Sequence, residues 1–257
     1  SLEWISMDIT QTLLLVVIGI GGGAWNAVAG GASLLTFPAL MAAGLPPVVA
    51  NATNFVGLLP SNAAALPAYR EELRGLGREL RPLIIVSGAG AIVGSVLLVV
   101  SDPHTFVALI PALIFTATLL FAFGDRVRAL LLVSASATTS RSIVYAGLFV
   151  ASIYGGYFGA GLGFILLAVA QILGHDDFHV ANCIKNLLAT TFTIISIAVF
   201  GLGGLIDWTA AVAMMVGATV GGYLGGRYAR RVNQKLLRAA VIVFGMVLSA
   251  TYLLRVI

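Results

Sequence analysis

Apolar residues fill most of the chain, and short charged or turn-rich stretches divide it into eight apolar segments. The dividing stretches are 70–81, 101–104, 124–141 and 227–238, with shorter ones at 44–47, 174–179 and 201–207. A helix of about 20 apolar residues crosses the ~30 Å hydrocarbon core of a bilayer. Segments of that length lie at 48–69, 82–100, 104–123, 179–200, 207–226 and 236–256. The pattern therefore predicts an all-α polytopic membrane protein.

The two remaining segments, 9–43 and 142–173, are longer than one span. Each would extend over about 45 Å as a continuous helix. Glycine clusters interrupt them, at 21–23 and 30–31 in the first and within 155–163 in the second. Because a glycine costs a helix interior about 1 kcal/mol relative to alanine, the clusters predict breaks. Each segment is then either a long kinked span or a hairpin of two half-helices of about 11–15 residues that enters and leaves on one side.

The distribution of Lys and Arg favours the hairpins. Positive residues in short loops stay on the cytoplasmic side of a membrane. If both long segments cross, the positive residues of the loops and of the C-terminal end divide eight against five; if both are re-entrant, twelve share one side and Arg255 alone lies on the other. We therefore predict six crossings and two re-entrant hairpins, with both termini outside.

The two halves of the chain also resemble each other. Residues 29–30 (AG) and 49–51 (VAN) recur at 160–161 and 180–182, both at an offset of 131. Farther on, GAIVG at 90–94 corresponds to GATVG at 217–221, at an offset of 127. Such matches also arise by composition in Gly- and Ala-rich membrane helices. With three crossings per half, however, the second half must be inverted, and inverted repeats with broken helices are typical of secondary transporters.

These boundaries define the expected domain organisation. Residues 1–8 are an N-terminal tail in which Met7 is interpreted as the native start and residues 1–6 as an appended segment. Repeat 1 covers 9–123, a cytoplasmic linker covers 124–141, and repeat 2 covers 142–257. Each repeat is expected to hold one re-entrant broken-helix hairpin and three transmembrane helices.

Composition excludes several other classes of protein. The 257 residues are 60% hydrophobic and 9% charged, with a net charge of +4, whereas an ordinary soluble domain is about 25% charged. So few charges cannot cover a globule in water, which excludes a soluble enzyme, a disordered chain and a nucleic-acid binder; the partner of the surface is a lipid bilayer. The single cysteine, Cys183, excludes a disulfide framework and a Cys-x-x-Cys metal site.

The repeated motifs resemble those of the TauE/SafE sulfite exporter family over nearly the whole chain. The first half carries GGASLLTFPAL at 30–40 followed by GLPPVVANATN at 44–54, and the second carries GAGLGF at 159–164 followed by ANCIKNLLA at 181–189. The second half is closer to the family pattern than the first. The resemblance implies export of small sulfur-containing anions, such as sulfite or short organosulfonates, without fixing the substrate.

The second arms of the hairpins are expected to begin near Ser33 and Gly163, close to the membrane midplane. A helix N-terminus has free N–H groups and about half a positive charge, which suits an anion. Glycines beside it let a ligand approach the backbone. The alternative is that these glycines serve only close helix packing. The candidate residues at the two breaks are Gly30, Gly31, Ser33 and Thr36 in the first, and Gly161 and Gly163 in the second.

Lys185 is the one cation placed well inside a predicted span. A charge there costs at least ~2.5–3.5 kcal/mol, so it should face a cavity or a partner, unless it reaches the membrane surface by snorkelling. Asn182 and Asn186 share its helical face at i−3 and i+1, and Asn51 and Asn54 are the corresponding pair in repeat 1. Carboxamides donate hydrogen bonds to oxyanions without adding charge. We expect these residues to bind the anion.

The sequence thus predicts a secondary transporter in the inner membrane that exports a small anion by alternating access, with no catalytic residue, cofactor or bound metal. A passive anion channel and an intramembrane metal-dependent enzyme built on His175 and His179 are the alternatives. The simpler interpretation of 175–179 is an interfacial loop in which Asp177 caps the next helix. Exact substrate, direction, ion coupling and oligomeric state, a homodimer included, stay open.

Overall fold

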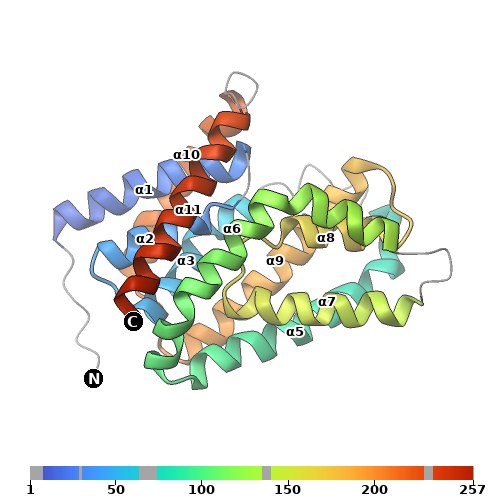
Figure 1. Ribbon diagram of the computed structural model, residues 1–257, viewed down its shortest axis with the longest axis horizontal. Helices are drawn as coiled ribbons and strands as arrows, with labels where there is room; N and C mark the ends of the chain where they lie inside the picture. Colours follow the sequence, from blue (N-terminus) through green and yellow to red (C-terminus); the bar gives the residue numbers. More distant parts are fainter. Residues whose placement is uncertain (1–7, 29–30, 64–73, 135–139, 229–233, 257) are drawn as a thin grey trace.

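The computed structural model describes residues 8–28, 31–63, 74–134, 140–228 and 234–256, and nearly all of these are helical (Figure 1). The first half of the chain contains α1 (Ile9–Val28), α2 (Ser33–Ala42), α3 (Pro47–Ala63), the short 3-10 helix η2 (Gly77–Glu79), α5 (Leu80–Val100) and α6 (Pro103–Ser134). The second half contains α7 (Arg141–Tyr157), α8 (Gly163–Ile172), α9 (Phe178–Leu202), α10 (Trp208–Tyr228) and α11 (Gln234–Val256). The predicted all-α polytopic class is confirmed.

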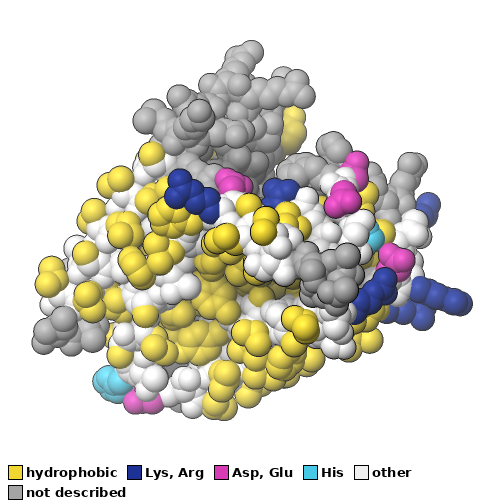
Figure 2. Space-filling view, turned by 45° about the vertical axis from the view of Figure 1, so that its right-hand side comes forward, with side chains coloured by type: hydrophobic (Ala, Val, Ile, Leu, Met, Phe, Trp, Pro, Cys, Tyr) yellow, Lys and Arg dark blue, Asp and Glu magenta, His cyan; other side chains and the backbone are white. Residues whose placement is uncertain are grey.

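The outer surface of the helices is apolar, as a lipid-facing surface must be. Large side chains such as Ile85, Val150 and Val243 are more than half exposed. Figure 2 shows broad hydrophobic areas on one face, with Lys and Arg gathered toward its upper and right-hand edges. Among the described residues, four helices are long and apolar enough to cross a membrane: Ile9–Asn26, Arg74–Val100, Pro103–Ser134 and Val180–Leu202.

Both long apolar segments are broken, between α1 and α2 and between α7 and α8. Each break lies after the first glycines of its cluster and not at them. α1 has 20 residues and α7 has 17, and each is followed by a helix of 10 residues. The prediction of half-helices of 11–15 residues was therefore wrong for the first arms. The glycines at 21–23 and 155–156 stay helical. Two of them serve close packing, because a Cβ on Gly23 would overlap the Ala218 carbonyl and one on Gly156 the Ala91 carbonyl.

The second arms, α2 and α8, run in opposite directions from the middle of α6. Gly31, before α2, and Gly161, before α8, lie against residues 117–121 of α6. Phe37 of α2 then reaches Phe106 near the start of α6, with ring centroids 6.4 Å apart. At the other end, the Arg128 Nε of α6 donates to the Gln171 Oε1 of α8 at 2.6 Å. Each segment folds back on itself as a helical hairpin (Figure 1), and its re-entrance into the bilayer stays a prediction.

The two halves of the chain exchange packing partners. α1 of the first half packs along α10 of the second, and α7 packs in the same way along α5. α3 contacts α10 as α9 contacts α5, while α3 and α9 meet each other, as do α6 and α11. If each helix is replaced by its counterpart in the other half, the contact of α1 with α10 becomes that of α7 with α5, and the contact of α3 with α10 becomes that of α9 with α5. The contacts of α3 with α9 and of α6 with α11 stay the same. The halves therefore form one interlocked body, with neither half packed as a unit of its own.

Glycines make the two longest of these contacts possible. A Cβ on Gly94 of α5 would overlap the Ile153 carbonyl of α7, and one on Gly221 of α10 would overlap the Ile20 carbonyl of α1. Small residues four apart allow helix backbones in membranes to approach closely. The GAIVG and GATVG sequences thus have the same role in the two halves: each lets its helix pack closely on the first helix of the opposite half.

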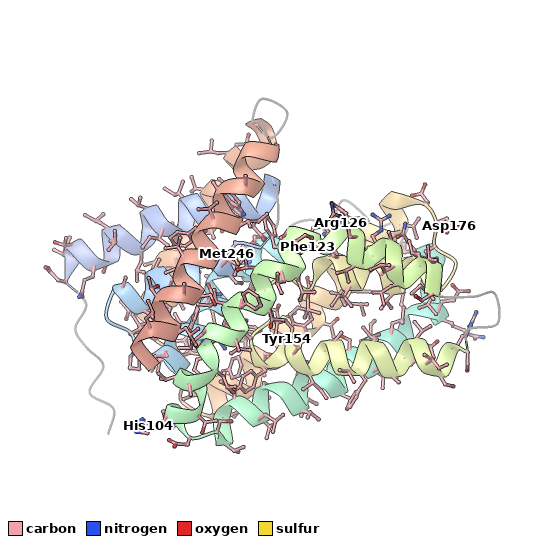
Figure 3. All side chains as sticks on the ribbon, in the orientation of Figure 1. His104, Phe123, Arg126, Tyr154, Asp176 and Met246 are labelled. Carbon is pink, nitrogen blue, oxygen red and sulfur yellow. The ribbon has the colours of Figure 1, made fainter. Side chains whose placement is uncertain are left out.

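The predicted linker is partly helical. α6 continues through Gly124 to Ser134, well beyond the expected end of the span at 123. Gly124 stays helical and serves close packing, because it lies under the Phe164 ring of α8, where a Cβ would overlap the ring. The extension carries Arg126 and Arg128 beyond the apolar part of α6, and Figure 3 shows Arg126 and Asp176 along the upper side of the molecule and His104 at the lower left. We call the end that holds Arg74, Arg78, Arg81, Arg126, Arg128 and Arg141 the basic face.

Candidate functional site

The two breaks meet at a cavity of about 560 Å³ in the interior of the helix bundle. Residues 31–33 from the first break and 158–164 from the second line it. α3 and α9 supply most of the remaining polar side chains, α1 supplies Asn26, and Phe121 of α6 closes one wall. A cavity of this size is typical of small-molecule sites.

Left-handed backbone at glycine lets the chain turn sharply into both short helices. The φ angles of Gly31, Gly159 and Gly161 are +75°, +75° and +82°, values that residues with a Cβ rarely adopt. α2 then begins at Ser33 and α8 at Gly163, without a side-chain hydrogen bond at either N-cap. The amides of a first helical turn have no partner within the helix, so both N-termini bring partial positive charge to the cavity.

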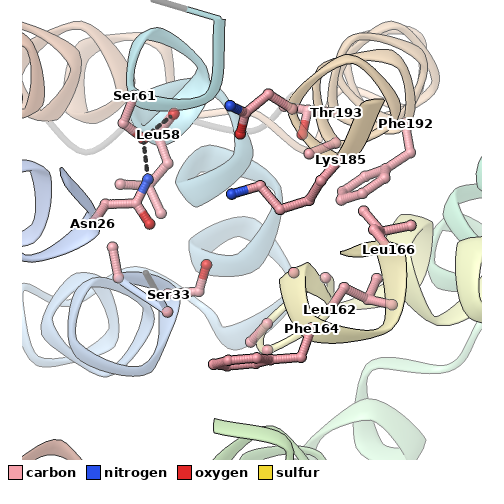
Figure 4. A pocket seen from close by; sticks show the side chains of 18 of the residues that line it. Asn26, Ser33, Leu58, Ser61, Leu162, Phe164, Leu166, Lys185, Phe192 and Thr193 are labelled. Carbon is pink, nitrogen blue, oxygen red and sulfur yellow. Dashed lines mark hydrogen bonds between the residues drawn. The ribbon is translucent and has the colours of Figure 1, made fainter. Parts of the chain in front are cut away.

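Lys185 projects into the cavity from the second turn of α9. Its ammonium group points toward the side where Asn26 and Ser33 lie, and Phe192, Leu166 and Leu162 lie behind it (Figure 4). The side chain crosses the start of α8, since a Cβ on Gly163 would lie 3.8 Å from the Lys185 Cδ. No carboxylate of the described residues lies within ion-pair distance of it. Its positive charge and the α8 N-terminus thus reinforce each other in the cavity.

Three asparagines of α3 and α9 line the cavity with this lysine. Asn182 and Asn186 flank Lys185 on α9, as their spacing predicts, and Asn54 comes from α3. The Asn54 Oδ1 accepts a hydrogen bond from the Thr36 hydroxyl at 2.6 Å, so α2 and α3 are joined directly behind the cavity wall. Among the described residues no further hydrogen bond of Asn54 is found, which leaves its amide N–H groups available to a ligand.

Most of the residues predicted for binding are brought together. Gly31, Ser33, Asn54, Gly161, Gly163, Asn182, Lys185 and Asn186 all line the cavity. Gly30 lies outside the described residues. Asn51 does not line the cavity: it is fully buried behind it, and its Nδ2 donates to the Tyr157 carbonyl at 2.9 Å. Asn51 lies three residues before Asn54 on α3 and points toward the end of α7. The expectation that Asn51 and Asn54 share the helical face that lines the cavity was therefore wrong.

Sequence reasoning missed most of the other cavity residues. Asn26 of α1 lines it, with its Nδ2 donating to the Ser61 Oγ of α3 at 2.7 Å (Figure 4). Thr193 and Phe192 lie two turns beyond Lys185 and Asn186, so extending the helical face of α9 would have found them. Phe55, Phe121, Phe158 and Phe164 carry no such signal, because phenylalanine is ordinary throughout an apolar chain.

The 175–179 stretch behaves as an interfacial turn. The Asp177 Oδ1 accepts from the Val180 amide at 3.0 Å, which confirms the predicted cap of α9. His175 Nε2 lies 3.8 Å from the Glu79 Oε2, at the start of α5. The His179 side chain lies outside the described residues. No group of three His, Cys, Asp or Glu that could hold a metal ion is found in the described part of the chain.

Comparison with known proteins agrees with this architecture. The family model for the sulfite exporter TauE/SafE matches residues 15–252. The chain belongs to the TauE/SafE sulfite exporter family. No solved structure matches it.

Proteins similar to this chain over nearly its whole length are described as membrane transporters. A probable membrane transporter protein of Haemophilus influenzae is 32% identical over 259 residues, which cover 95% of this chain and 96% of the relative. The probable membrane transporter protein YfcA of Escherichia coli is 29% identical over 96% of this chain and 93% of its own length. This TauE/SafE protein is therefore a multi-pass membrane transporter.

Proposed function

We propose that this TauE/SafE protein is a secondary transporter of the inner membrane that exports small sulfur-containing anions, such as sulfite or short organosulfonates, by alternating access. The observation that carries the proposal is the position of Lys185, in a central cavity where the N-termini of α2 and α8 converge. The family description points to the sulfur oxyanion.

Electrostatics favour an anion in this cavity. A lysine within a span costs at least ~2.5–3.5 kcal/mol unless it faces water or a partner, and Lys185 has no acidic partner among the described residues. Each helix N-terminus adds about half a positive charge. A bound oxyanion would neutralise this charge and accept hydrogen bonds from Asn54, Asn182 and Asn186. A cation would be repelled by Lys185 and by both helix N-termini.

The packing of the helices supports two inverted repeats with boundaries at 9–123 and 142–257. α2 and α8 leave the middle of α6 in opposite directions, and contacts between the halves are reciprocal. Inverted repeats with discontinuous helices place the substrate near the midplane, at the repeat interface. The cavity lies at that interface, which is the arrangement that alternating access requires.

Aromatic rings close the cavity on the side away from the basic face. Phe158 lines the cavity, and the Phe37 ring packs on it with centroids 5.3 Å apart. Phe37 packs in turn on Phe106, in the first turns of α6 at the end that His104 marks in Figure 3. All three rings are buried. A stack of edge-to-face rings of this kind supports a closed pathway on the side that we assign to the exterior.

On the opposite side the described residues offer a polar contact and no stack of aromatic rings. The cavity extends to Asn26 and Ser61, in the last turns of α1 and α3, which one hydrogen bond joins. Breaking such a bond costs about 1 kcal/mol. The next described residue after α3 is Arg74, on the basic face, which the positive-inside rule assigns to the cytoplasm. This arrangement supports loading from the cytoplasm, as an exporter requires.

Asn51 offers a means of coupling the closed side to the break. Its amide holds the Tyr157 carbonyl at the end of α7, while its Oδ1 has no partner among the described residues. A buried oxygen without a partner costs about 1–3 kcal/mol. A change of partner at Asn51 would relieve this cost if the backbone after Tyr157 rearranged, which fits a two-state transporter.

Transport by the purified protein in liposomes tests the proposal. We expect saturable sulfite transport that Lys185→Ala abolishes, because the substitution removes the one side-chain cation of the described cavity. Arg141→Gln, which removes an exposed charge outside the cavity, should leave transport unchanged. Equal transport by Lys185→Ala and the wild type would overturn the site. A flux that rises linearly with concentration would show a passive channel instead.

A further inference from the structure

Thr36 lies one layer behind the anion cavity. It sits in the first turn of α2, is fully buried and does not line the cavity, whereas Asn54, its partner on α3, does. Gly22 of α1 faces the Thr36 methyl group so closely that a Cβ on Gly22 would overlap it. Since the methyl group is held in this way, the hydroxyl of Thr36 is fixed toward Asn54.

The geometry of the contact identifies its donor. The Thr36 Oγ1 lies 2.6 Å from the Asn54 Oδ1 and 3.0 Å from the Ala32 carbonyl oxygen. The Asn54 carboxamide turns its Oδ1 toward this hydroxyl. The hydroxyl has one proton, and the Asn54 Oδ1 is the nearer of its two acceptors, so the amide oxygen of Asn54 accepts. Its NH₂ group is left to the cavity.

We propose that Thr36 is a positioning residue of the anion site, and that its hydroxyl holds the Asn54 carboxamide with the NH₂ group toward the bound anion. This inference rests on the proposed transport of anions through the same cavity. A carboxamide presents either two donors or an acceptor, depending on a rotation of 180° about its terminal bond. Only one of these orientations attracts an anion, so the group that fixes the rotation contributes to affinity without touching the ligand.

Thr36→Val separates this role from packing, because valine keeps the shape and loses the hydroxyl. Without an anion, the Asn54 oxygen of the variant can turn to water in the cavity. When an anion binds, the Asn54 oxygen has two places to go. It either turns back toward the valine at position 36, where it has no hydrogen-bond partner, or it faces the anion. Both outcomes are unfavourable, and the cost appears only on binding. We therefore expect anion affinity to fall about tenfold while the melting temperature without anion changes little.

The experiment measures sulfite and methanesulfonate dissociation constants of the full-length protein in detergent, by thermal shift and by calorimetry. Thr36→Ser should bind within about twofold of the wild type, since it keeps the donor. Thr118→Val is the matched control: Thr118 is also fully buried and bonds to the Ile114 carbonyl of its own helix, but it does not line the cavity or contact Asn54. Its affinity for both anions should equal that of the wild type.

A double-mutant cycle tests whether Thr36 acts through Asn54. Asn54→Ala should itself weaken binding, and Thr36→Val should then have no further effect, because there is no carboxamide left to orient. Additive losses would overturn the proposal. Unchanged or tighter binding by Thr36→Val would also overturn it, since that result would mean that the amide oxygen faces the cavity.

The outcomes separate this inference from the proposed function. If the wild type binds neither anion, the anion site itself is refuted and Thr36 has nothing to position. If the wild type binds and Lys185→Ala does not, but Thr36→Val matches the wild type, the transporter proposal stands and the positioning role fails. A loss of affinity that Thr36→Ser does not rescue would point to packing and would likewise refute the role.

Discussion

The two break regions share a backbone design and differ in chemistry. In each, a glycine-rich turn with positive φ leads into a helix of 10 residues, which ends at a second positive-φ glycine, Gly44 (+100°) or Gly174 (+95°). The following helix then lines the cavity. At the repeat offset of 131, Asn54 in α3 corresponds to Lys185 in α9. One half thus offers a neutral donor where the other offers a cation.

This difference shows that fold and specificity are set separately. The repeated glycines and small residues place two helix N-termini and two polar helices around one cavity. The departure from the repeat, Lys185 against Asn54, then gives the cavity its side-chain charge. A transporter of this design could change its cargo through such positions while the packing of α1 on α10 and of α5 on α7 stays intact.

Exchanging the two residues is expected to have the largest effect. Lys185→Asn makes the second half like the first and should lower sulfite affinity about 10- to 100-fold, because a charge-assisted contact is worth about 1.5–3 kcal/mol. Adding Asn54→Lys returns one cation to the same cavity from the other side. We expect the double variant to recover part of the lost sulfite binding, as calorimetry on the purified protein would show.

The single variants supply the controls for this exchange. Asn54→Lys alone should raise affinity for sulfate, a dianion, relative to methanesulfonate, because the cavity then holds two side-chain cations. If the double variant binds no better than Lys185→Asn alone, the position of the charge matters as well as its presence. The pseudo-symmetry of the cavity would then not extend to its chemistry.

An intermediate and equal effect is expected where the two halves pack on each other. Gly94→Ala and Gly221→Ala each force a methyl group against a backbone carbonyl of the facing helix. Overpacking of this kind typically costs about 1–3 kcal/mol. Gly147→Ala is the control, since nothing lies within 4 Å of its added Cβ. Unfolding of the purified variants should show similar losses for the first two and none for Gly147→Ala; clearly unequal losses would break the equivalence of the two interfaces.

Much of the fold could be predicted because lipid imposes a simple pattern. The segments at 82–100, 179–200 and 207–226 match α5, α9 and α10 to within two residues at each end. Glycine was harder to interpret, since one residue type serves both breaks and close contacts. Gly23 packs against α10, whereas Gly31 turns the chain. A glycine that stays helical does so where another helix backbone packs against it, and a single sequence does not show which helices pack together.

The site could be predicted where polarity is rare and not where it is common. Lys185 and its neighbouring asparagines are conspicuous in an apolar helix, and all of them line the cavity. Asn51 shares that signal but bonds to the Tyr157 carbonyl, because the partner of a buried amide depends on the neighbouring helix. The aromatic closure formed by Phe37, Phe106 and Phe158 left no trace in the sequence pattern.

The smallest effect is expected at the turns that follow the two short helices. His175 occupies the place that Leu45 has in the first half: the His175 amide donates to the Ala170 carbonyl and the Leu45 amide to the Leu40 carbonyl, both at 3.2 Å. His175→Leu therefore keeps the backbone of the turn and removes only the 3.8 Å contact with Glu79, whose side chain is 66% exposed.

A 3.8 Å contact with an exposed carboxylate contributes less than about 1 kcal/mol, and leucine can fill the mostly buried place of the His175 side chain, so His175→Leu should leave both stability and sulfite transport close to those of the wild type. Thermal unfolding and liposome transport of the variant check this expectation. A collapse of transport with normal stability would give His175 a chemical task that Leu45 does not have, as a proton carrier or metal ligand. The second turn, like the second helix pair, would then depart from the repeat for a functional reason.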